Sequence, residues 1–126
     1  VGSEMCIRDS SYPDRISASF ERLDFAKCTN LTFEQPDTKR FRNLSLAYEA
    51  MYRGGNMPCI VNAANEVVVA SFLKDGISFL GMSDVIEKTM EQAAFVANPS
   101  YEDYVATDEE ARRIASELVR RQNPQK

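Results

Sequence analysis

After residue 37, apolar side chains recur at three- and four-residue steps, and glycine or proline interrupts the pattern several times. This spacing places apolar side chains on one face of a helix, and the interruptions mark where each helix ends. The first run stops at Gly54-Gly55, since a glycine past the last turn commonly ends a helix. Its predicted core face consists of Phe41, Leu44, Ala47, Tyr48, Met51 and Tyr52.

The remaining runs have the same period. The second run is apolar almost all round, which predicts a helix at the centre of a bundle, and it stops at Gly76. Its apolar residues are Ile60, Val61, Ala64, Val67, Val68, Phe72 and Leu73. Ser83 is the expected N-cap of the third, whose stripe is Val85, Ile86, Thr89, Met90 and Ala93. Thr107 and Glu110 have the spacing of a capping box before the last stripe, which is Ala111, Ile114, Ala115, Leu118 and Val119.

These runs predict a mostly α fold, with a small bundle of about four helices over residues 37–126. Residues 11–36 precede it as an extended segment, in which the alternating Leu31-Thr32-Phe33 is expected to form a short strand. That segment resembles the edge of another domain. Residues 1–10 show neither helical nor strand periodicity and lack an initiating methionine, so we interpret them as a non-native leader or read artefact.

Composition restricts the possible chemistry. The chain has 126 residues, a net charge of −4 and no histidine. The missing histidine excludes Ser-His-Asp and Cys-His nucleophiles and histidine metal ligands within these residues. The acidic balance argues against nucleic-acid binding, including a helix-turn-helix reader. No apolar run reaches the roughly 20 residues of a membrane span.

Cysteine and glycine spacing excludes two further kinds of site. Cys6, Cys28 and Cys59 form no C-x-x-C pair, so we expect small buried apolar residues in a reducing, cytoplasmic protein. The glycines form neither a G-x-G-x-x-G nor a Walker pattern, which argues against a self-contained nucleotide site. The carboxylates fall at helix starts or on predicted exposed faces, where solvated surface groups are the commonest outcome.

One polar cluster interrupts the apolar second run, in the sequence Asn62-Ala63-Ala64-Asn65-Glu66. Asn62, Asn65 and Glu66 share a helical face at three- and four-residue spacing. Asn62 could cap a helix, or the three could form a hydrogen-bonded brace between helix and linker, since buried amides most often satisfy backbone groups. A contact with substrate is the alternative. The apolar stripes could likewise line a ligand cavity rather than a core.

Several of these segments, taken in order, resemble the C-terminal part of the 1-deoxy-D-xylulose 5-phosphate reductoisomerase family. The most specific is the Asn62-Ala63-Ala64-Asn65-Glu66-Val67 segment after Gly54-Gly55 and Pro58. Supporting segments are Tyr12-Pro13-Asp14-Arg15-Ile16, Leu23-Asp24-Phe25, Leu31 to Asp37 and Val85-Ile86-Glu87. The resemblance covers about residues 11–120, and its last helix is generic.

The resemblance implies an enzyme of isoprenoid precursor synthesis, in the methylerythritol phosphate pathway. The family isomerises a ketose phosphate and reduces the product with NADPH, aided by magnesium or manganese. Its fold has a Rossmann domain, a central α/β catalytic domain that mediates homodimerisation, and a C-terminal helical domain. Residues 11–36 would then be the tail of the catalytic domain and residues 37–126 the helical bundle.

The resemblance assigns no catalytic, cofactor-binding or metal-binding residue to this chain, because the family's motifs for those roles precede the matched region. The chain alone is expected to bind neither NADPH nor metal, to be inactive and to be prone to aggregation. Asn62, Asn65 and Glu66 are expected to brace the bundle against the rest of the enzyme. An alternative is a free-standing helical module that binds a protein partner.

Overall fold

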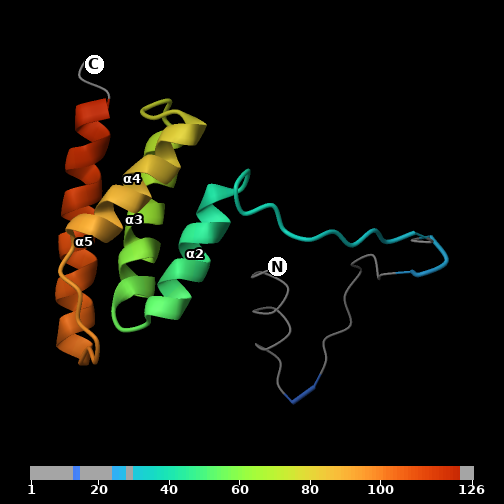
Figure 1. Ribbon diagram of the computed structural model, residues 1–126, viewed down its shortest axis with the longest axis horizontal. Helices are drawn as coiled ribbons and strands as arrows, with labels where there is room; N and C mark the ends of the chain where they lie inside the picture. The colour runs from blue at the N-terminus through green and yellow to red at the C-terminus, as the bar shows by residue number, and fades with distance from the viewer. Residues whose placement is uncertain (1–12, 15–23, 28–29, 123–126) are drawn as a thin grey trace. The chain divides into compact units, whose positions relative to one another are not determined.

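The chain is described by a computed structural model in which residues 13–14, 24–27 and 30–122 are placed. It divides into two units, Val1–Glu34 and Gln35–Lys126, which are described separately. The second unit contains α2 (Arg42–Arg53), α3 (Met57–Phe72), α4 (Phe79–Gln92) and α5 (Tyr101–Gln122), drawn in Figure 1. These helices confirm the predicted mostly α bundle.

Helix α3 is the centre of the bundle, as its apolar composition predicts, since α2, α4 and α5 all pack against it. Its buried side chains are Met57, Ile60, Ala63, Ala64 and Val68. From the other helices and the α4–α5 loop the core receives Leu46, Ala50, Met82, Val85, Ile86, Met90, Ala93, Ala111, Ile114, Ala115 and Leu118. Alanines at the contacts allow the helix backbones to approach closely, and the larger side chains fill the space between them.

The predicted core face of α2 is wrong. Leu46 and Ala50 are the residues that α2 buries. The predicted stripe remains exposed, from 36% at Leu44 to 82% at Tyr52. Residues two apart lie on nearly opposite sides of a helix with 3.6 residues per turn, so Leu44 and Leu46 face opposite ways. The helix therefore has two apolar faces, and periodicity alone selected the outer one.

Two helices start before the residues that the sequence indicated. The N-cap of α4 is Ser78 rather than Ser83, and its hydroxyl accepts a hydrogen bond from the Gly81 amide at 3.1 Å. At the start of α5, Ser100 and Asp103 form the capping box, because each side chain bonds the other's amide, at 3.2 and 2.8 Å. Ser100 and Asp103 have the same spacing as Thr107 and Glu110, but only the first pair lies at the start of the helix.

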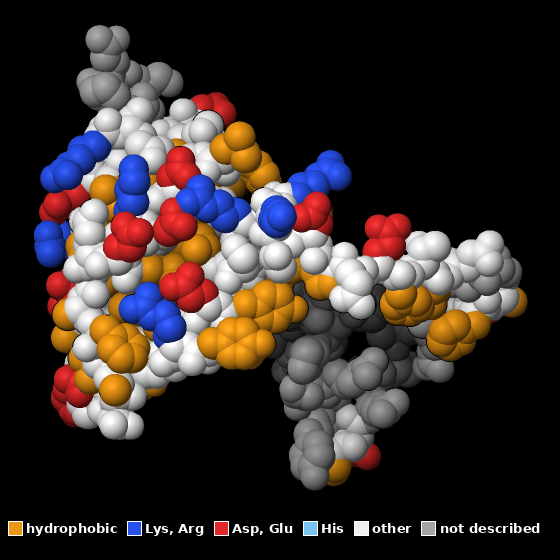
Figure 2. All heavy atoms as spheres, in the orientation of Figure 1, with side chains coloured by type: hydrophobic (Ala, Val, Ile, Leu, Met, Phe, Trp, Pro, Cys, Tyr) orange, Lys and Arg blue, Asp and Glu red, His pale blue; other side chains and the backbone are white. Residues whose placement is uncertain are grey.

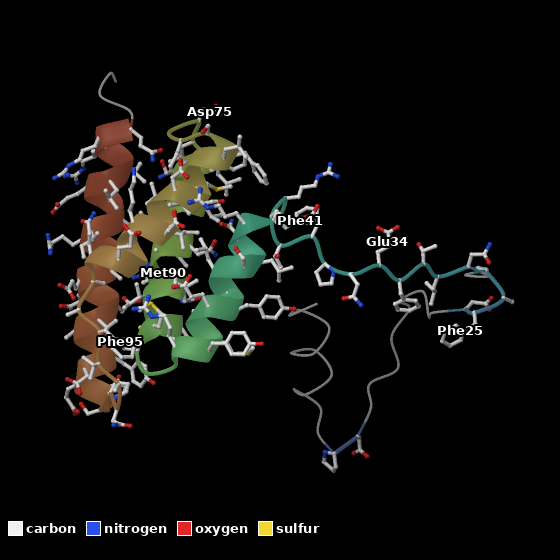
Figure 3. All side chains as sticks on the ribbon, viewed as in Figure 1. Phe25, Glu34, Phe41, Asp75, Met90 and Phe95 are labelled. Atoms are coloured by element: carbon white, nitrogen blue, oxygen red, sulfur yellow. The ribbon has the colours of Figure 1, made fainter. Side chains whose placement is uncertain are left out.

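The turn between α3 and α4 also differs from the prediction, because the residue in the left-handed backbone region is not the expected glycine. Asp75 has φ of 54°, whereas the sequence indicated Gly76 as the residue that ends the helix. The Gly76 amide donates to the Ser71 carbonyl at 2.9 Å, which closes the turn after α3. Aspartate is one of the few residues besides glycine that occupy this region of backbone conformation. Figure 3 labels Asp75 in this turn.

In the first unit, the structure assigns no strand to its described residues, so the expected strand at Leu31-Thr32-Phe33 is wrong. Leu31 and Phe33 are both exposed, at 65% and 89%. A strand needs a neighbouring strand for its backbone hydrogen bonds, and these residues have none among the described ones. The leader at residues 1–10, with Cys6, and also Cys28 lie outside the described residues.

None of the helices placed in the described part of the chain is long and apolar enough to cross a membrane.

Candidate functional site

The polar cluster predicted on α3 lies on the surface of the bundle. Asn62, Asn65 and Glu66 are all exposed, while the intervening Ala63 and Ala64 are fully buried. Asn62 lies inside α3, so it is not a cap. Its amide nitrogen donates to Glu66 Oε1 at 3.4 Å, one turn later in the helix. The structure thus brings Asn62 and Glu66 together.

Arg112 connects this cluster to α5. Its Nη2 lies 2.7 Å from Glu66 Oε2, and its Nε lies 2.7 Å from Asp108 Oδ2 on its own helix. The hydrogen bonds that Arg112 donates to Asp108 and then to Glu66 raise the pKa of its guanidinium above the usual value. The Glu66–Arg112 pair joins α3 to α5 across the surface.

Replacing Glu66 with Gln is expected to lower the free energy of unfolding by about 0.5 kcal/mol, because exposed ion pairs contribute little. The loss should shrink in about 1 M salt, which screens such pairs. Glu91→Gln, which removes an exposed carboxylate from α4, controls for the change in net charge. Denaturant unfolding at low and high salt measures both variants. A loss of several kcal/mol, or one insensitive to salt, would contradict this estimate.

The most tightly held polar side chain is one that the sequence did not single out. Asn56, which is fully buried, precedes α3 and reaches the loop after α4. Its Nδ2 donates to the Ala94 carbonyl and to Thr107 Oγ1, both at 2.9 Å. Its Oδ1 accepts from the Val96 amide at 2.9 Å. Its own amide donates to the Val96 carbonyl at 3.0 Å. One residue therefore joins the start of α3, the α4–α5 loop and α5.

The two glycines before Asn56 let this loop approach. Gly54 and Gly55 have φ of 64° and 57°, which side chains with a Cβ rarely adopt. A Cβ on Gly55 would overlap the Val96 carbonyl oxygen and lie 3.0 Å from the Phe95 ring. Gly55 therefore lies against backbone, a contact that fully accounts for its lack of a side chain. Figure 3 labels Phe95 in this loop.

Sequence reasoning missed Asn56 because it weighed asparagines within an apolar run and passed over the one in a turn. A signal was present: Gly-Gly-Asn followed by Pro58 at the start of a helix places the asparagine at the helix boundary. Its partner Thr107 was interpreted as a cap, but it is buried inside α5. Which loop Asn56 contacts depends on packing between helices that are distant in sequence.

The described residues offer little reactive chemistry. Among them, no group of three or more His, Cys, Asp or Glu side chains could hold a metal ion. Burial, followed by the charge of Asp108, raises the pKa of the Cys59 thiol, and Arg112 only partly opposes this. A thiol that stays protonated at neutral pH is a poor nucleophile. A shallow depression of about 620 Å³ lies beside Tyr48 and Tyr52 of α2.

Comparisons with known proteins agree on one family. The model of the family described as "DXP reductoisomerase C-terminal domain" matches residues 9–114. The chain is 86% identical over 109 residues to the 1-deoxy-D-xylulose 5-phosphate reductoisomerase of Bacteroides thetaiotaomicron, a match covering 86% of this chain and 28% of the relative. It is 74% identical over 109 residues to that of Phocaeicola vulgatus, again covering 86% of this chain and 28% of the relative.

A solved structure agrees with the sequence matches. It is 1-deoxy-D-xylulose 5-phosphate reductoisomerase from Zymomonas mobilis in complex with NADPH, 41% identical to this chain with a TM-score of 0.73. The match covers 90% of this chain and 30% of that one. The chain thus spans somewhat under a third of the length of the proteins it matches. With most of its residues in the family match, the chain belongs to the DXP reductoisomerase C-terminal domain family.

Proposed function

We propose that this chain is the C-terminal helical part of an NADPH-dependent 1-deoxy-D-xylulose 5-phosphate reductoisomerase. The parent enzyme would isomerise this ketose phosphate and reduce the product to 2-C-methyl-D-erythritol 4-phosphate, an isoprenoid precursor. The observation that carries the proposal is the 86% identity over 109 residues to a relative named for this activity. Residues 11–36 would belong to the tail of the catalytic domain and residues 37–126 to the helical domain.

The contribution of this chain to the reaction is structural. Among the described residues, no three His, Cys, Asp or Glu side chains are grouped as a magnesium or manganese site would require. We assign no reaction step to the residues of this chain. NADPH and metal would both be held by the preceding part of the parent, and the similar Zymomonas mobilis protein was solved in complex with NADPH.

The remaining proposals concern the parent's assembly and setting. Its partners would be a second copy, in a homodimer, and the small ketose phosphate substrate, in the cytoplasm. Asn62, Asn65 and Glu66 would brace the bundle against the rest of the enzyme. The exposure of all three supports this, because each side chain is accessible to a neighbouring domain.

The 126-residue chain by itself is expected to be helical and prone to aggregate, and to oxidise no NADPH in the presence of the ketose phosphate. A matched positive control is a hybrid, the full-length Bacteroides thetaiotaomicron enzyme in which the matched part of this chain replaces its 109-residue counterpart. That hybrid is expected to turn over NADPH. Absorbance at the NADPH band measures NADPH oxidation, light scattering measures aggregation, and circular dichroism measures helix content.

Two outcomes would contradict this function. Turnover by the 126-residue chain would show that it carries catalytic groups of its own. A folded but inactive hybrid would show that the chain does not complete a reductoisomerase. A monodisperse chain that binds a protein partner would favour the alternative, a free-standing helical interaction module.

A further inference from the structure

The first helix of the bundle has two apolar faces, and the bundle uses only one of them. Leu46 and Ala50 face the other helices and are buried, each only 3% exposed. Arg42 holds the same helix to α4 through ion pairs with Asp84, at 2.6 Å, and Glu87. These contacts account for how α2 is attached to its own unit.

The opposite face, which we call the outer face of α2, consists of Leu44, Tyr48, Met51 and Tyr52, with Phe41 just before the helix. Exposed fractions are 59% for Phe41, 40% for Tyr48, 61% for Met51 and 82% for Tyr52. The spacing of three, four and three residues from Phe41 to Met51 forms one continuous stripe. Figure 2 shows large hydrophobic side chains on the surface of the bundle near α2.

Such a surface differs from scattered exposed residues. Isolated apolar side chains on a surface are ordinary, whereas a continuous stripe that includes aromatic residues and methionine is typical of an interface. The depression of about 620 Å³ lies on this face, between the two tyrosines and the Glu49–Arg53 ion pair. Tyrosine combines a large apolar ring with a hydroxyl that can bond a partner, so it suits a contact of mixed polarity.

We propose that the outer face of α2 is the surface on which the bundle docks against the catalytic part of the parent reductoisomerase. This inference rests on the proposed function, since that function supplies the occupant. The match covers only 28% of the Bacteroides thetaiotaomicron relative, so the larger part of such a parent chain would lie outside it and be available to cover the stripe. α2 is the first helix of the bundle, so of the four helices it follows that part most directly along the chain.

Hydroxyl-radical footprinting tests the docking directly, because tyrosine and methionine side chains are modified in proportion to their exposure. The 126-residue chain is compared with the hybrid full-length enzyme defined above. Modification of Met51 and Tyr52 is expected to fall severalfold in the hybrid. Tyr101, which is 77% exposed at the start of α5, is the matched control and should keep its reactivity.

A pair of matched variants gives a second measurement. Tyr52→Glu should lower the melting temperature of the hybrid, because it places a charge in an apolar contact, and Tyr101→Glu should not. In the 126-residue chain neither variant should change the melting temperature appreciably, since both tyrosines are largely exposed there.

Three results would overturn the docking. The first is equal reactivity of Met51 and Tyr52 in the hybrid and in the 126-residue chain. The second is protection of Tyr101 to the same degree. The third is protection of Met51 and Tyr52 in the 126-residue chain as its concentration rises, which would assign the face to a second copy. NADPH turnover is measured separately, so an inactive hybrid with protected Met51 and Tyr52 would contradict the function and leave the docking standing.

Discussion

Replacing Asn56 with Ala is expected to lower the free energy of unfolding by about 3 kcal/mol. The substitution removes a fully buried side chain and leaves the Thr107 hydroxyl, and the half-buried Val96 amide and Ala94 carbonyl, without their partner. Each unpaired buried group costs about 1–3 kcal/mol, partly recovered where water can enter. For a bundle of this size the melting temperature should fall by about 15 °C. Denaturant titration and thermal unfolding, both followed by circular dichroism, measure the effect.

Two further variants show whether hydrogen bonding is the cause. Thr107→Val keeps the shape of the side chain and removes one acceptor from Asn56, so it should cost about 1 kcal/mol. Asn65→Ala removes an exposed asparagine from the same helix as a control, and should be close to neutral, since alanine favours helix. If Asn56→Ala were no worse than Asn65→Ala, the proposed role of Asn56 in holding the loop would be wrong.

Gly55→Ala is expected to destabilise the bundle by about 4 kcal/mol or more. The added methyl group would overlap the Val96 carbonyl oxygen and approach the Cα of Ala97 to 3.1 Å. Backbone cannot rotate away as a side chain can, so the α4–α5 loop would have to move. That movement would break the bond from the Asn56 amide to the Val96 carbonyl, which is 3.0 Å long. The same unfolding measurements apply.

A substitution at the neighbouring Gly54 distinguishes the cost of steric overlap from the cost of backbone strain. Gly54 also has positive φ, but a Cβ there would meet nothing within 4 Å. Gly54→Ala should therefore cost only the strain of its conformation, about 1–3 kcal/mol. In a double-mutant cycle, Gly55→Ala and Asn56→Ala should cost less together than the sum of their separate effects, because both release the same loop. Additive effects, or equal costs for the two glycines, would contradict this account of the turn.

Sequence periodicity predicted the helices but was less reliable about their faces and ends. The stripes of α3, α4 and α5 include most of the residues that these helices bury, because each has only one strongly apolar face or is apolar nearly all round. α2 has two apolar faces, and its outer one is larger and more aromatic, so pattern alone selected the exposed side. Cap signals such as Ser83 and Thr107 recur within helices, so spacing by itself could not identify the true ends.

The sequence predicted only part of the polar contacts that the structure shows. Periodicity correctly put Asn62 and Glu66 on one face, where they interact. The sequence could not show that Arg112, on a different helix, would complete the cluster. Nor could it show that Asn56 would be the buried polar residue, because its partners in the α4–α5 loop and α5 lie 38 or more residues away.

The sequence by itself determined that the segments after residue 37 are helical, that Gly54-Gly55 ends the first helix, and which family the chain resembles. These properties depend on local periodicity and local backbone preference, which short segments carry without their neighbours. The tertiary structure decided which face of α2 is buried, which asparagine holds the α4–α5 loop, and which apolar stripe remains for a partner. Those choices depend on how helices distant in the sequence pack, since an apolar side chain is buried only where another surface covers it.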